Sequence, residues 1–190
     1  ALLTSNTIAE NSGLRPGEPI LVCRATLPVP APQVAYDNKD SCTAIQSYAT
    51  YEGADMDQSF PTDELITNLT IPDNVVYIDD RSFRDTNMQF SYIQFPEALM
   101  FIGKDAFSGA LDASMTTLDL SNTSITHIVK RAFANNNLTS VILPNTIEYV
   151  HEDAFANNPG TDGNGAGLPG AQGTQSLYSG PFTLQNNHID

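Results

Sequence analysis

The chain has 190 residues, of which 41% are hydrophobic and only 16% charged, and its formal net charge is −14 at pH 7. This length predicts one domain, or one domain with ordered extensions, and the hydrophobic fraction is enough for a core. Eight basic residues against 22 acidic ones argue against nucleic acid as a partner, because binding to phosphates needs clustered lysine and arginine. No apolar run is long enough to span a membrane.

Residues 1–60 contain no repeat, and we expect them to form an irregular N-terminal cap or arm. The prolines at 28, 30 and 32 predict extended backbone rather than helix. Because the first unit of a repeat array exposes an apolar edge, a cap over that edge is the expected role. The alternative is an arm that wraps a neighbouring subunit.

Cys23 and Cys42 are the only cysteines, and both lie in this N-terminal part. Their even number, the low charge and a start at Ala1 rather than Met predict one disulfide in an oxidising compartment. That compartment is the cell exterior or surface, or alternatively a lumen or periplasm reached after removal of a targeting peptide. The other interpretation is two unrelated buried thiols.

Residues 61–158 contain four similar segments, which we call the first to fourth coils. Aligned on Leu69, Ile93, Leu118 and Val141, successive copies are offset by 24, 25 and 23 residues. Each coil has the same order of features: an apolar residue, the aligned residue, a corner, two spaced apolar residues and a closing phenylalanine. The opening residues are Ile66, Phe90, Met115 and Leu138; the corner residues are Pro72, Pro96, Ser121 and Pro144; the closing residues are Phe83, Phe107, Phe133 and Phe155.

A period of this length predicts a solenoid, mainly β, with short helical turns. Each coil would contain a short strand, a proline corner, a second extended piece and a small helical turn that ends at the phenylalanine. One coil cannot bury its own apolar edge, whereas stacked coils can. The four closing phenylalanines are then expected to form an aromatic ladder in the core. The third coil departs from the pattern at Ser121 and has one inserted residue before Ile125, so we expect a bulge there.

The pattern, roughly L-x-x-I-x-I-P-x-x-V-x-x-I-x-x-x-A-F, resembles the BspA-type leucine-rich repeats over about residues 66–158. The resemblance implies a solenoid used for adhesion or protein binding, as in surface proteins of bacteria and protists. It implies no catalytic residues, and no cofactor.

Two further columns appear in the alignment. The first column consists of residues that each precede an inward-facing residue: Tyr77, Phe101, His127 and Tyr149. Because successive side chains in an extended segment point to opposite sides, this column should face outward. We predict an exposed aromatic strip that contacts a protein or glycan partner. The alternative is a strip that only stabilises the sheet or is covered by the N-terminal segment. The second column alternates in sign and predicts ion pairs between coils: Arg81, Asp105, Arg131 and Asp153.

Residues 159–190 form a Gly-rich segment, expected to be a linker, followed by a possible C-terminal strand that covers the last coil. The ligand spacing of its Asp and Asn residues fits no calcium motif. Three N-x-S/T sites, at Asn68, Asn122 and Asn137, are no more than the composition would give by chance, so they are no evidence for glycosylation.

No catalytic motif is present, and the three histidines lack metal-ligand spacing. The sequence therefore predicts a protein that is not an enzyme and binds no metal. Three functions remain open: a secreted or surface protein that binds other proteins, a structural subunit of a larger assembly such as a filament or membrane complex, and a glycan-binding module.

Overall fold

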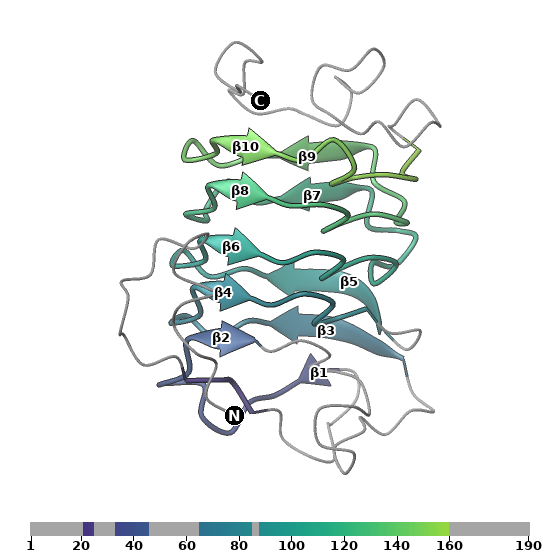
Figure 1. Cartoon of the computed structure of the whole chain (residues 1–190). Coiled ribbons are helices and arrows are strands. Elements are labelled where there is room, and N and C mark those ends of the chain that lie inside the picture. Colours follow the sequence, from purple (N-terminus) through teal and green to yellow (C-terminus); the bar gives the residue numbers. More distant parts are fainter. Residues whose placement is uncertain (1–20, 25–32, 46–64, 85–87, 160–190) are drawn as a thin grey trace.

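The computed structural model describes residues 21–24, 33–45, 65–84 and 88–159, and these form a parallel β-solenoid (Figure 1). The chain runs around the stack, adding one strand to each of two sides per coil. The predicted solenoid is confirmed. The possible C-terminal strand lies outside the described residues, as do most of residues 1–60.

One side of the stack is a continuous five-stranded sheet, which we call the even-strand sheet. Its order is β10-β8-β6-β4-β2, and all pairs are parallel. Each strand is two residues long and comes from the second extended piece of a coil: Ala44–Ile45, Tyr77–Ile78, Phe101–Ile102, His127–Ile128 and Tyr149–Val150.

The other side carries the first strand of each coil together with β1, and here the pairing is interrupted. One sheet has the order β1-β3-β5, and a separate sheet pairs β7 with β9. We call these the odd-strand sheets. Their strands are Gln33–Val34, Ile66–Thr70, Met88–Gln94, Thr117–Asp119 and Ser140–Ile142.

The closing phenylalanines form the core ladder that the repeat predicts. All four are fully buried. Ring centroids are 4.9 Å apart for Phe83 and Phe107, 5.3 Å for Phe107 and Phe133, and 5.7 Å for Phe133 and Phe155, with interplanar angles of 25°, 5° and 8°. These separations lie within the range of favourable aromatic pairs. The Phe column therefore holds each coil in line with the next.

The expected short helical turn before each phenylalanine is wrong, because no helix occurs in the parts of the chain that the structure describes. Tight turns stand in its place, and Arg81, Asp105 and Arg131 have positive φ angles of 57°, 56° and 60°. A residue in this left-handed region cannot continue a right-handed helix. The turn therefore changes direction at the same position in three successive coils.

The described parts of the N-terminal segment, which we call the cap, pair with the first coil. Val34 of β1 pairs with Leu69, and Ile45 of β2 pairs with Ile78, so both strands extend the sheets of the repeats. Val22 forms a further parallel bridge to Ala44. These residues continue the register of the solenoid.

The predicted disulfide is present. It joins Cys23 to Cys42 with their Cα atoms 4.9 Å apart, and both residues are buried. The side chain of Asn38 adds two hydrogen bonds across the same link: it accepts one from the Arg24 amide at 2.9 Å and donates one to the Val22 carbonyl at 3.0 Å. Residues 21–24 are thereby fixed against the cap.

Candidate functional site

The aromatic column lies on the even-strand sheet in the register that the sequence alignment predicts. Tyr77 pairs with Phe101, Phe101 with His127, and His127 with Tyr149 in successive parallel strands. The rings of Tyr77 and Phe101 stack with centroids 5.0 Å apart and planes 2° apart. Their faces are therefore turned toward each other, along the axis of the stack.

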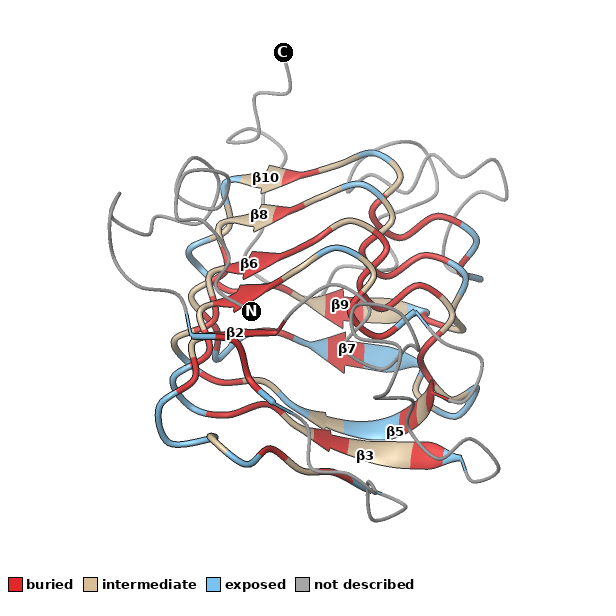
Figure 2. Cartoon of the chain, turned by 60° about the horizontal axis from the view of Figure 1, so that its bottom comes forward, coloured by how far each residue is buried: buried red, intermediate tan, exposed pale blue. Residues whose placement is uncertain are grey.

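The predicted exposure of this column is wrong for its first two members. Tyr77 is 7% exposed and Phe101 6%, whereas His127 and Tyr149 are half-buried, as the strand colours of Figure 2 show. Tyr77 and Phe101 cluster with Ala44 of the cap. The alternative interpretation, cover by the N-terminal segment, therefore fits this half of the column better.

The hydroxyl of Tyr77 donates a hydrogen bond to Asp79 Oδ1 at 3.2 Å. Burial raises the pKa of Tyr77 well above its usual value, and the negative charges of Asp79 and Asp80 add to the shift. Ionisation of this phenol would place an anion beside two carboxylates in a poorly hydrated site. The side chain of Tyr77 is therefore held in its neutral form and serves a structural role.

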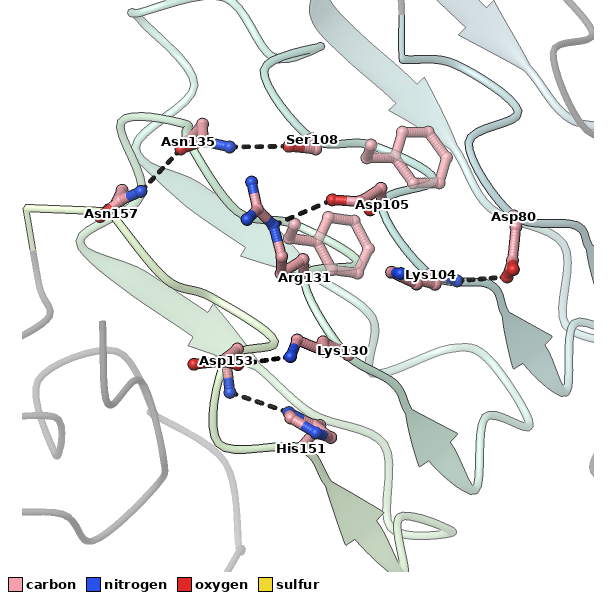
Figure 3. Close-up of polar contacts among 12 residues, drawn as sticks. Asp80, Lys104, Asp105, Ser108, Lys130, Arg131, Asn135, His151, Asp153 and Asn157 are labelled. Carbon is pink, nitrogen blue, oxygen red and sulfur yellow. Dashed lines mark hydrogen bonds and ion pairs between the residues drawn. The ribbon is translucent and has the colours of Figure 1, made fainter.

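The open half of the column is an aromatic cluster on the third and fourth coils. The rings of His127 and Tyr149 are 5.9 Å apart, and His151 packs edge-on to Tyr149 at 6.4 Å. His151 Nδ1 accepts a hydrogen bond from the Asp153 amide at 3.0 Å (Figure 3), which leaves the proton of the neutral ring on Nε2. The cluster offers partly exposed apolar ring area together with hydrogen-bonding groups.

Ion pairs between coils are present at two places (Figure 3). Arg131 Nε lies 3.0 Å from Asp105 Oδ1, within the predicted column, and Lys130 Nζ lies 3.5 Å from Asp153 Oδ2. The Asp105 side chain is only 5% exposed. The Lys130 pair is largely exposed, and such pairs contribute about 0–1 kcal/mol. This column therefore belongs to the stacking of coils.

In the third and fourth coils, an asparagine three residues after the closing phenylalanine bridges two coils, and it was not among the residues predicted from the sequence. Asn136 Nδ2 donates to the carbonyls of Phe107 and Phe133 at 3.0 and 2.9 Å, and its Oδ1 accepts from the Leu111 amide at 3.0 Å. Asn158 makes the equivalent three bonds one coil later. Their recurrence at the same offset from the phenylalanine was the available signal.

The odd-strand sheets present a second outward face that the sequence analysis did not consider. Tyr92 of β5 is 53% exposed, which is the largest exposure of any aromatic side chain among the described residues. Equivalent outward positions in the neighbouring strands hold small polar side chains: Asn68, Thr117 and Ser140. This face is mostly uncharged, with one large ring near its middle.

Between β5 and β7 the stack opens on this face. No strand pairing joins the two within the described residues, although β6 and β8, on the opposite side of the same coils, are paired. A hollow of about 520 Å³ lies at the ends of these strands. Its lining comes from three corners: Asp73; Gln94, Phe95, Pro96 and Glu97; and Ser121, Asn122, Thr123 and Ser124.

The predicted bulge of the third coil thus adjoins the hollow. Ser121 stands where the other coils have proline, and Thr123 closes the corner through a bond from its amide to the Leu120 carbonyl at 3.0 Å. The Ser124 hydroxyl donates to the Glu97 carbonyl at 2.8 Å, which fixes this corner to the second coil. The extra residue is accommodated in the corner itself.

Among the described residues, no three His, Cys, Asp or Glu side chains lie close enough to hold a metal ion. The same residues contain no helix that could cross a membrane. His188, the third histidine, lies outside them.

The sequence matches the family model described as "BspA type Leucine rich repeat region", in six copies over residues 56–162. This match covers more than half of the chain, and it agrees with the resemblance found from the repeat pattern. No curated protein matches the chain.

Proposed function

Because the chain belongs to the BspA-type leucine-rich repeat family, we propose that it is a non-catalytic protein, secreted or displayed at a cell surface, that binds other proteins and takes part in adhesion. The family points to protein partners and to a surface location. A solenoid of this kind serves as a scaffold for contacts. The disulfide between Cys23 and Cys42 is compatible with an oxidising compartment.

The observation that carries the proposal is the open half of the aromatic column. His127 and Tyr149 remain partly exposed on the paired strands β8 and β10, while their counterparts Tyr77 and Phe101 are buried. Aromatic side chains that offer both apolar area and a polar group are favoured at protein interfaces. These two residues are therefore the proposed contact surface.

Glycan binding along the column is less well supported. The rings of Tyr77 and Phe101 stack face to face, so their faces are not free to receive a sugar ring. The structural-subunit alternative also loses one argument, because the described N-terminal strands pair with their own first coil rather than extending away as an arm.

The test is binding of the purified, oxidised chain to an array of extracellular proteins from its source and to unpermeabilised source cells. The double variant His127→Ser/Tyr149→Ser should lose at least about tenfold in affinity for the partner found. A control, Asn145→Ser/Glu152→Ser, changes two exposed residues of the fourth coil, and this variant should bind within about twofold of the parent chain. Equal binding by both variants would remove this surface from the proposal.

Native material from the source distinguishes the proposal from the structural-subunit alternative. A monomer at the cell surface or in the medium, measured by size-exclusion chromatography with light scattering, agrees with the proposal. Recovery only within a stoichiometric filament or membrane complex would favour the subunit. Recovery only from the cytosol would contradict both.

A further inference from the structure

We propose that the opening between β5 and β7 is a site for an extended segment of a partner protein, which adds one parallel strand there and places a lysine or arginine side chain in the adjoining hollow. This inference rests on the proposed function in that the ligand is a protein. The site lies on a different face from His127 and Tyr149, so an experiment can refute this inference without refuting the proposed function, and the reverse.

The first support is the backbone. Gln94 accepts a hydrogen bond from the Ile71 amide, so its polar groups face β3. Since backbone groups alternate along a strand, those of Ile93 and Phe95 face β7. By the same reasoning, the bond from the Leu120 amide to the Ile142 carbonyl turns Thr117 and Asp119 toward β5.

Two strand edges therefore face each other across the opening, and no backbone bond between them exists in the described part of the chain. Paired strands lie about 4.8 Å apart, and no residue of β5 is paired with a residue of β7 in the described ranges. Figure 1 shows a wider interval between β5 and β7 than between β3 and β5 or β7 and β9. We expect this interval to admit one additional strand.

The path of the chain before β7 accounts for the opening. Ten residues, 108–117, separate Phe107 from Leu118, compared with seven before Val141 and nine before Ile93, so length alone does not decide the pairing. The start of the longer segment pairs with β5 at only one point, the bridge between Phe90 and Leu111. It then turns away at Asp112, whose side chain accepts hydrogen bonds from Ser114. The second half of β5 is left without a neighbour on this side.

The second support is apolar. Ile93, Phe95 and Met115 occupy inward positions of the repeat, yet all three are only partly buried. Their counterparts in the other coils are buried, as Leu69, Ile71 and Ile66 in the first coil illustrate. An inserted strand would cover this apolar area with alternate side chains of its own.

The third support is charge. Asp73 and Glu97 are exposed carboxylates on the lining of the 520 Å³ hollow, and no basic residue lines it. The remaining polar lining consists of hydroxyl and amide groups. A strand that runs parallel to β5 would reach this hollow at its C-terminal end. The expected ligand therefore has two apolar residues at alternate positions, followed closely by Lys or Arg.

The experiment uses the full chain with its disulfide formed. Phage-displayed random nonapeptides are selected on the immobilised chain, and the strongest binder is made with a fluorescein label. Its affinity is measured by fluorescence polarisation, with a scrambled peptide of the same composition as the control for simple charge attraction. We expect the selected peptides to share the apolar–x–apolar–basic pattern and to bind at least tenfold more tightly than the scrambled one.

Two pairs of variants locate the site. Thr117→Pro removes one amide that faces the opening and should weaken binding at least about tenfold, whereas Thr117→Val keeps the amide and should stay within twofold. Asp73→Asn/Glu97→Gln should also cost about tenfold. Its control, Asp40→Asn/Glu148→Gln, removes the same charge from exposed positions elsewhere and should change affinity less than twofold.

Hydrogen exchange of single amides provides a readout that needs no variant. The amides of Phe95, Thr117 and Asp119 should exchange rapidly in the free chain and at least tenfold more slowly with saturating peptide. Several outcomes would overturn the proposal: no binder is selected, protection appears elsewhere, the scrambled peptide binds equally well, or these amides are already protected in the free chain. Protection that grows with protein concentration would instead assign the opening to a second copy of the chain.

Discussion

Replacement of Asn136 by alanine tests whether the bridging asparagines are a main element of coil stacking. The side chain makes three hydrogen bonds of 2.9–3.0 Å, to two carbonyls and one amide. The Phe107 carbonyl also accepts from the Ala110 amide, and the Phe133 carbonyl from Asn158 Nδ2. These two acceptors keep a donor in the variant. The amide of Leu111, a buried residue, loses its partner.

The magnitude follows from this difference. Loss of a hydrogen bond whose other group stays satisfied costs about 1 kcal/mol, and a buried donor left without a partner costs about 1–3 kcal/mol. Two bonds of the first kind and one of the second sum to about 3–5 kcal/mol for Asn136→Ala. Part of the cost is recovered if water reaches the Leu111 amide, so about 3 kcal/mol is the expected loss in free energy of unfolding.

Urea denaturation followed by far-ultraviolet circular dichroism measures this loss, since the chain has no tryptophan. Asn137→Ala is the matched control: its side chain makes one exposed hydrogen bond, to the Ala113 carbonyl at 2.8 Å, and its loss should cost about 1 kcal/mol or less. If Asn136→Ala destabilises no more than Asn137→Ala, the bridging role assigned to this column is incorrect.

Three further predictions concern the core, the cap and alkaline pH. Phe133→Ala should cost about 3–5 kcal/mol in urea denaturation, because its ring stacks on Phe107 and Phe155; a cost below about 1 kcal/mol would contradict the ladder. Joint replacement of Cys23 and Cys42 by serine should cost about 3 kcal/mol, given the separation of 19 residues, and unchanged stability would show that the cap holds without the bond. Between pH 8 and 10 the contribution of the buried tyrosines to stability should be constant. Above pH 10, the unfolded-state pKa of tyrosine, stability should fall, because burial raises the pKa of both Tyr77 and Tyr36 in the folded chain; Tyr77→Phe should reduce this fall without abolishing it, as measured by thermal melts across pH 8–12.

Much of the fold could be predicted from the sequence because stacking forces equivalent residues into contact. A strand register shifted by one residue would turn inward side chains outward, so the spacing of Leu69, Ile93, Leu118 and Val141 already determines which residues align. Three of these four positions are buried in the structure. The Phe column follows from the same constraint.

Exposure was harder to predict than register. The outward direction of Tyr77 and Phe101 was expected from alternation, yet alternation describes one strand and not what packs on it. Contact with Ala44 and face-to-face stacking bury both rings. Ala44 comes from the non-repeating segment, for which the sequence pattern set no register.

The opening between β5 and β7 could be predicted only in part. Ser121 and the inserted residue pointed to a bulge in the third coil, and the structure places the hollow beside that corner. The loss of pairing, however, also depends on the long segment after Phe107, whose turn at Asp112 is formed by local hydrogen bonds to Ser114. Local hydrogen bonds of this kind compete with strand pairing. The repeat pattern does not predict whether the segment forms these local bonds or pairs with β5.

The interruption of the odd-strand sheets also bears on how the chain unfolds. In a stack where each coil contacts only its neighbours, stability is a sum of terms for single coils and for the interfaces between them. The interface between the second and third coils retains β6–β8 pairing and the Phe107–Phe133 stack but has only one paired sheet, whereas the interface between the third and fourth coils has two. By strand pairing alone it is the least connected junction between the described coils, so we expect partial unfolding to begin there and to separate the first two coils, with their cap, from the last two.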